Sequence, residues 1–88
     1  MPGQDRHILI GIHVKDRTQQ AAEVQEALTR HGAYIKTRLG LHEARPDFSA
    51  TTGVILLEML DNEPKRAALM DDLNRIPGVE TQQMIFDH

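Results

Sequence analysis

Histidine is the side chain of this sequence best suited to hold a metal ion, because its neutral imidazole binds nickel, zinc and iron. The chain has 88 residues, of which five are histidines and none is cysteine. His7 and His13 stand six positions apart, about 20 Å along an extended strand, which is too far to share one ion. A site therefore requires His13 with a residue of another strand, such as Glu58, or a histidine of a second copy. We expect no resident cofactor and keep this metal site as the alternative.

The turn Lys15-Asp16-Arg17 is a second set of residues able to bind a ligand. It follows an apolar segment and precedes a helical pattern, and the free amide groups and dipole of a helix start favour an anion. Arg38, expected on a neighbouring strand, would add positive charge. The other interpretation is a capped helix start whose charged side chains stay in water. Lys15, Asp16, Arg17 and Arg38 are the candidate effector site.

Residues for enzymatic chemistry are sparse. The chain offers no cysteine nucleophile, and its single serine, Ser49, has no histidine in a recognised arrangement with it. No two carboxylates are spaced for acid–base work. We expect a protein that is not an enzyme, with a small dimeric enzyme of the same fold as a weaker alternative.

Composition excludes several further classes. The formal net charge is −3, and the chain has no Trp, one Tyr and two Phe. A direct nucleic-acid binder would carry a basic face or stacking aromatics, so none is expected. No apolar run approaches the ~20 residues that span a bilayer, and the start lacks a signal-peptide pattern. We expect a cytoplasmic protein with no membrane contact.

Hydrophobic periodicity predicts six elements. Alternation with a period of two indicates strands at residues 7–14, 34–41, 51–60 and 79–86. In the second strand, Ile35, Thr37, Leu39 and Leu41 are expected on one face. Helical spacing indicates helices at residues 19–31 and from about Asn62 to Pro77-Gly78.

The apolar positions of the two helices predict which faces are buried. They are Ala21, Val24, Ala27, Leu28 and His31 in the first helix, and Ala67, Leu69, Met70, Leu73 and Ile76 in the second. Gly32 is expected to end the first helix in the left-handed conformation. His31, at that end, is expected to interact with the helix dipole.

The order strand, helix, strand, strand, helix, strand predicts an α+β, ferredoxin-like βαββαβ fold. Strands 1 and 3 are the most apolar, so they should be central in a four-stranded antiparallel sheet with both helices on one face. We expect a single domain over residues 1–88, with residues 1–6 flexible and a long mobile connection at residues 42–50.

The side of the sheet without helices should carry large apolar residues, namely Leu9, Val54, Leu56, Leu60, Met84 and Phe86. Such a patch is larger than a small monomer usually exposes. A second copy is therefore expected to cover it, giving a dimer or tetramer. The alternative is that the Arg45-Pro46-Asp47 loop folds over the patch.

Four segments resemble the family of iron-only hydrogenase system regulators. They are ILIGIHVKDR at residues 8–17, IKTRLGL at 35–41, GVILLEM at 53–59 and LNRIPGVE at 73–80. The most specific pieces are VKDR and RLG, and the likeness extends over residues 7–86. The family is ACT-like and similar to the C-terminal regulatory domain of the nickel-responsive repressor.

The resemblance implies an oligomeric regulatory or ligand-sensing module linked to iron-only hydrogenase or redox metabolism. Its effector would be a small molecule or a protein, and a nickel, iron or zinc sensor at a subunit contact is the alternative. Lys15-Asp16-Arg17 replaces the glycine that opens the effector loop of amino-acid-binding ACT domains. Amino-acid binding is therefore not implied.

Overall fold

The computed structural model describes residues 6–15, 17–41 and 53–87, without the side chains of residues 17–19 and 41. The predicted mobile connection and the Arg45-Pro46-Asp47 loop lie outside these residues. The element order is β1 (His7–Val14), α1 (Arg17–Arg30), the short 3₁₀ helix η1 (Gly32–Tyr34), β2 (Ile35–Leu41), β3 (Gly53–Met59), α2 (Glu63–Asn74) and β4 (Val79–Phe86). The predicted βαββαβ order is confirmed.

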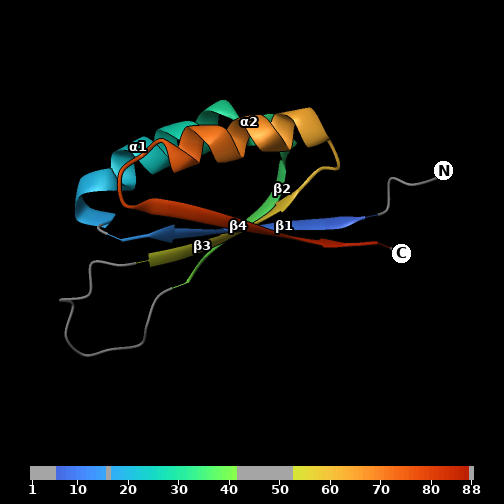
Figure 1. The fold of residues 1–88 in the computed structure, drawn as a ribbon, viewed down its shortest axis with the longest axis horizontal. Coiled ribbons are helices and arrows are strands. Elements are labelled where there is room, and N and C mark those ends of the chain that lie inside the picture. The colour runs from blue at the N-terminus through green and yellow to red at the C-terminus, as the bar shows by residue number, and fades with distance from the viewer. Residues whose placement is uncertain (1–5, 16, 42–52, 88) are drawn as a thin grey trace.

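The four strands form one antiparallel sheet in the order β2-β3-β1-β4. The two most apolar strands, β1 and β3, are central as predicted. Each of them pairs with a neighbouring strand along both of its edges. Both helices lie on one side of the sheet (Figure 1). The ferredoxin-like arrangement is therefore confirmed, and the other side of the sheet has no helix over it.

Strict alternation along β1 builds the core. Ile8, Ile10, Ile12 and Val14 are buried under the helices, whereas His7 and His13 point to the opposite side. The buried residues that pack with them are Val24, Ala27, Leu28, Leu57, Met59, Leu69, Leu73, Ile76 and Val79. Full burial of each large aliphatic side chain contributes about 1.5–3 kcal/mol, so this layer supplies most of the stabilising free energy.

A β-bulge in β2 corrects the predicted alternation of that strand. Ile35 pairs with Met59 on the helix side, but the register then shifts, and Thr37 pairs with Glu58 on the opposite side. A bulge adds one residue to a strand, so every later side chain changes face. Leu39 consequently points away from the helices and Arg38 points toward them.

The ends of α1 and the burial of both helices differ in part from the prediction. Gly32 does not adopt the left-handed conformation; the chain continues into η1, and the Tyr34 N–H donates to the His31 carbonyl at 3.1 Å. Among the described glycines, only Gly78 has a positive φ, of 81°. Ala21 and Ala67, expected in the core, are exposed.

The start of α2 follows the prediction. Asn62 caps it by accepting a hydrogen bond from the Lys65 N–H at 3.2 Å, and Pro64 stands in the first turn. Such a cap contributes about 1 kcal/mol. Arg6, expected in a flexible N-terminal segment, donates to both carboxylate oxygens of Asp61 at 3.0 and 2.7 Å. No helix in the described ranges is long and apolar enough to cross a bilayer.

Candidate functional site

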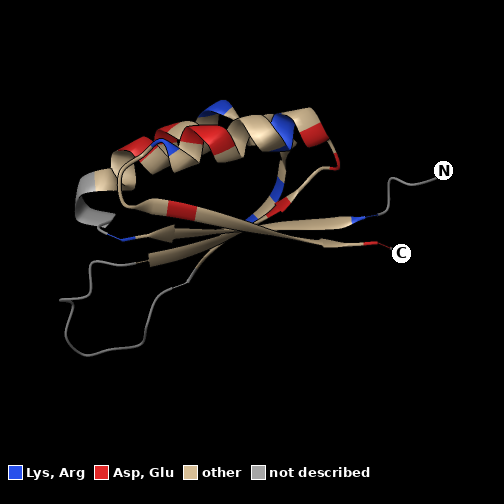
Figure 2. Ribbon diagram, in the orientation of Figure 1, with Lys and Arg blue, Asp and Glu red and all other residues tan. Residues whose placement is uncertain are grey.

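The side of the sheet away from the helices, which we name the open face, exposes several large apolar side chains. Its exposed large hydrophobic residues are Leu39, Val54, Leu56, Met84 and Phe86, and Leu60, which is also exposed, follows β3 directly. Half-buried Leu9 lies between them, since it pairs with Met84 on one side and Glu58 on the other. Met84 and Phe86 are 56% and 51% exposed. Figure 2 shows that charged residues gather on the helices and that the strands carry few.

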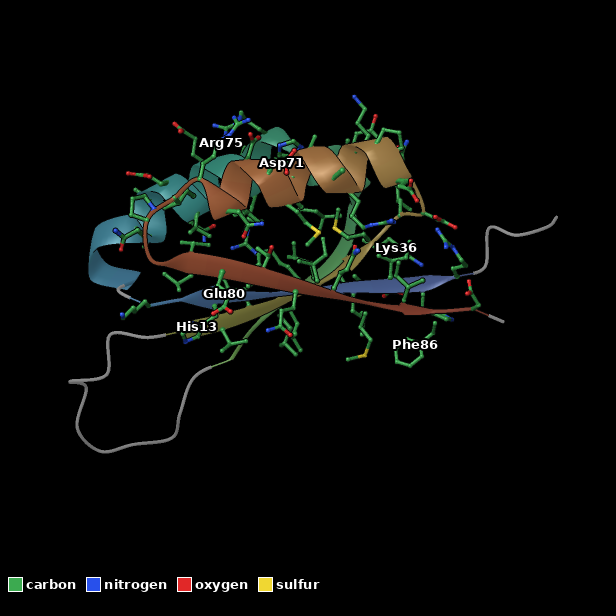
Figure 3. All side chains as sticks on the ribbon, viewed as in Figure 1. His13, Lys36, Asp71, Arg75, Glu80 and Phe86 are labelled. Carbon is green, nitrogen blue, oxygen red and sulfur yellow. The ribbon has the colours of Figure 1, made fainter. Side chains whose placement is uncertain are left out.

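The structure thus brings together the predicted interface residues and adds Leu39. The bulge in β2 is the reason for the addition, because without it Leu39 would face the helices. Phe86 and His13 lie on the same side of the sheet (Figure 3). Large apolar area and few charges are properties of a surface that another protein covers.

Polar pairs lie at both ends of the open face. At one end, Glu58 Oε2 is 3.4 Å from His7 Nδ1 and 3.5 Å from Lys36 Nζ. The hydrogen bond with His7 and the charge of Lys36 lower the pKa of Glu58 below its usual value. At the other end, His13 Nδ1 is 3.9 Å from Glu80 Oε1. We name Leu9, Leu39, Leu56 and Met84 the apolar centre of the face. At its two ends, Phe86 is opposite His7 and Val54 is opposite His13.

The predicted metal pair, His13 and Glu58, is not brought together within one chain. His13 is opposite Val54, and Glu58 is opposite Leu9, four residues away along β1. That separation is about 13 Å. The described residues contain no group of three or more His, Asp or Glu side chains able to hold an ion.

A hollow lies beside His13 on the open face. It has a volume of about 280 Å³ and is lined by Gly11, Ile12, His13, Val54, Glu80 and Gln82. Gly11 lacks the side chain that would fill it; an added Cβ would be 3.8 Å from Leu56 Cδ2 and 4.0 Å from the Gln82 carbonyl oxygen. The hollow therefore lies at the His13–Glu80 end of the face.

The predicted effector site is described only in part. Lys15 is exposed, and its N–H donates to the Gly78 carbonyl at 2.8 Å. Arg38 donates instead to Gln25 Oε1 of α1 at 2.7 Å. Asp16 and the side chain of Arg17 lie outside the described residues.

The register separates the two described members of that site. Arg38 is opposite Leu57, which is opposite Ile10. Lys15 follows Ile10 by five residues, or about 16 Å along the strand direction. Lys15 and Arg38 therefore do not form one anion site.

An ion cluster joins the two helices. His31 Nε2 is 2.7 Å from Asp72 Oδ2, and guanidinium nitrogens of Arg30 and Arg75 lie 3.6 and 3.7 Å from the same carboxylate. The hydrogen bond with His31 is the main reason that the pKa of Asp72 is lowered. The sequence predicted a helix-dipole role for His31 and gave no signal for a partner on the other helix.

A groove on the helix side runs along α2 against the edge of β4. Its volume is about 420 Å³, and it extends from Glu63 to Asn74 with Gln83 as the β4 contribution. Arg66 lines it and is only 5% exposed. Sequence reasoning missed Arg66, because a charged residue beside the predicted apolar stripe is normally solvated.

Comparison with known proteins identifies the fold. No protein-family model matches the chain, and no curated protein matches it. The solved structure of TM1266, an uncharacterized protein from Thermotoga maritima, is 23% identical, with a TM-score of 0.76 over 93% of this chain and 99% of that one.

Two ACT domains are also similar. That of the Chlorobium tepidum GTP pyrophosphokinase is 18% identical, with a TM-score of 0.67 over 89% of this chain and 96% of that one. That of the Bacillus anthracis prephenate dehydrogenase is 23% identical, with a TM-score of 0.56 over 84% of this chain and 99% of that one. This chain therefore has an ACT-like, ferredoxin-like fold.

Proposed function

We propose that this chain is a small, non-enzymatic regulatory module that senses a ligand and associates with a second copy through the open face. The observation that carries the proposal is that the strands of the open face expose the large hydrophobic side chains Leu39, Val54, Leu56, Met84 and Phe86. The ACT-like fold supports it, since two of the similar structures are ACT domains of larger enzymes.

A second copy is the occupant that the open face fits best. In a twofold interface the same surface of both copies meets, so an apolar centre contacts an apolar centre. His7 and Lys36 at one end and His13 and Glu80 at the other then lie toward the rim, and Glu58 stays paired with His7 and Lys36. An effector bound at the contact would favour one assembly over another by a shift of population.

Sedimentation tests the self-association. The wild-type chain should form a dimer or tetramer at micromolar concentration. Leu56→Glu and, independently, Met84→Lys should each raise the dissociation constant by about a hundredfold, because each places a charge in the apolar centre. Ala21→Glu, at an exposed position of α1, is the matched control and should leave the assembly unchanged. A wild-type monomer at these concentrations would contradict the proposal.

The second candidate function is a metal sensor, and the positions of His13 and Glu58 on the open face favour it. In β1, His13 lies two residues after Gly11 and Leu9 lies two residues before it. Glu58 is the residue of β3 that pairs with Leu9. A twofold axis that crosses the strands over Gly11 would bring His13 of one copy toward Glu58 of the other. Equilibrium dialysis with nickel, zinc and iron tests this; retention of less than stoichiometric metal by the assembled protein argues against it.

We further propose that the turn at Lys15, Asp16 and Arg17 binds an anionic effector and that the module acts in the cytoplasm on iron-only hydrogenase or redox metabolism. The helix start at Arg17 supports the first part, and the family resemblance supports the second. Thermal shift across metals, nucleotides and organic anions should identify the effector. Arg17→Ala should then weaken its binding markedly, and unchanged affinity would remove this site.

A further inference from the structure

The groove between α2 and β4 contains a buried arginine with too few partners. Arg66 is 5% exposed, and its Nη1 is shielded from water and has no hydrogen-bond partner in the part of the chain that the structure describes. The side chain of Arg66 ends in a guanidinium cation, so its burial places a positive charge inside the protein. A buried charge is costly unless an anion and hydrogen bonds compensate it.

The carboxylates near Arg66 compensate it poorly. Glu63 Oε2 lies 3.6 Å from Arg66 Nη2, which is beyond hydrogen-bond distance, and the Glu63 side chain is 78% exposed. Asp61 is close enough for Arg66 to contribute to its lowered pKa, but both of its carboxylate oxygens already accept from Arg6. Glu63 can therefore move away at little cost and uncover the guanidinium for a better anion.

The rest of the groove indicates what kind of anion fits. Beyond Arg66 the groove is lined by Ala67 and Met70, which offer an apolar wall. Asn74 Oδ1 accepts a hydrogen bond from the Thr81 hydroxyl at 3.0 Å, which fixes its amide at the far end. The volume of about 420 Å³ is in the range of small-molecule sites.

The charge balance selects a single negative charge. Arg66 is the only cation that lines the groove among the described residues, and the carboxylates of Glu63 and Asp71 also line it. A phosphate dianion would be repelled by both carboxylates, whereas one carboxylate group exchanges with the Glu63 side chain without adding charge to the pair.

We propose that this groove binds a small organic monocarboxylate. Its carboxylate replaces Glu63 at Arg66 and accepts hydrogen bonds from the guanidinium, and its hydrocarbon part lies against Ala67 and Met70. The groove is on the helix side of the sheet, so the proposal does not depend on self-association through the open face or on the turn at Lys15.

Titration with hexanoate, followed by NMR of the ¹⁵N-labelled full chain, tests the proposal. The Arg66 Nε–H and the Asn74 and Gln83 side-chain amides should shift and saturate with a Kd of about 1 mM, which is reasonable for eight non-hydrogen atoms. Inorganic phosphate at the same concentration should bind more weakly. Absence of saturable shifts with hexanoate, or tighter binding of phosphate, would overturn the proposal.

Three variants complete the test. Glu63→Gln should tighten hexanoate binding about threefold, because it removes the competing carboxylate. Arg66→Met should weaken binding about tenfold or more while leaving the melting temperature unchanged or higher, since an apolar side chain of similar length replaces an uncompensated charge. Glu80→Gln, on the open face, is the matched control and should bind as the wild type does. If Arg66→Met binds hexanoate normally, or if it lowers the melting temperature as a purely structural arginine would, the assignment is wrong.

Discussion

His31 at the end of α1 and Asp72 in α2 form a 2.7 Å hydrogen bond across 41 positions of sequence. Both side chains are largely shielded from water, with 15% and 26% exposed. Arg30 and Arg75 lie on either side of the same carboxylate, so one aspartate holds the ends of both helices together. Protonation of Asp72 would weaken this contact, so the packing of the two helices depends on pH.

We predict that the stabilising effect of Asp72 is lost in acid. The pKa of Asp72 is lower in the folded chain than its usual value, mainly because of the His31 hydrogen bond. Stability from a lowered carboxyl pKa is fully present above the unfolded value, near 4, and disappears as the pH falls through the folded value. Asp72→Asn should thus destabilise the protein near neutral pH and have little effect at the acid end of this window.

Urea unfolding at several pH values measures this difference. Asp71→Asn is the matched control, because Asp71 is adjacent, exposed and absent from the ion cluster. Asp71→Asn should leave the free energy of unfolding near neutral pH close to that of the wild type. A gap between wild type and Asp72→Asn that stays constant down to pH 2 would show that the hydrogen bond does not lower the pKa of Asp72.

A second prediction concerns the two glycines at helix ends. Gly78 has a φ of 81°, which L-residues with a side chain adopt only with strain. Gly78→Ala should therefore lower the free energy of unfolding by about 1–2 kcal/mol. Gly32→Ala should be neutral or slightly stabilising, because an added Cβ meets nothing within 4 Å and the backbone is not left-handed. Equal losses for both variants in chemical denaturation would contradict this.

The glycines illustrate what a sequence pattern can and cannot predict. A glycine after a helical stripe is compatible with a left-handed end, but Gly32 instead begins a 3₁₀ turn that leads into β2. Strand positions were predictable because β1 alternates strictly and β3 is a short, almost continuous apolar run, which is typical of a central strand. The bulge in β2 was not predictable, since the insertion of one residue does not change the alternation of polar and apolar residues in the sequence.

A third prediction tests the central strand. Leu57 in β3 is fully buried beneath the two helices. Leu57→Ala should therefore lower the free energy of unfolding by about 2–5 kcal/mol, because it removes buried methyl groups and leaves a cavity. Val54→Ala, on the open face of the same strand, should cost less than about 1 kcal/mol in the monomer. Denaturant unfolding at low protein concentration compares them. A cost for Val54→Ala equal to that of Leu57→Ala would mean that the two faces of β3 are covered alike.

The candidate sites were less predictable than the fold, for a physical reason. The apolar members of the open face follow from strand alternation, and all of them except Leu39 were predicted. Polar partnerships depend on long-range packing, so neither the His31–Asp72 contact nor the burial of Arg66 has a local signature. The predicted pairing of His13 with Glu58 failed within one chain because register, which sequence alone does not give, places them four residues apart.

The bulge in β2 gives the last prediction, since it decides which side of the sheet Leu39 occupies. Leu39 is 55% exposed on the open face opposite Leu56. A charged side chain at position 39 would be solvated in the monomer. In the assembly it would contact the apolar centre of the second copy. Leu39→Asp should therefore change the monomer's free energy of unfolding by less than about 1 kcal/mol while raising the dissociation constant about tenfold or more.

Unfolding at low concentration and sedimentation of the same samples separate the two effects of Leu39→Asp. Without the bulge, Leu39 would lie with Ile35 beneath the helices, and a buried aspartate would cost several kcal/mol. A large loss of monomer stability would thus contradict the register of β2. Normal stability with unchanged assembly would instead keep that register and remove Leu39 from the surface between copies.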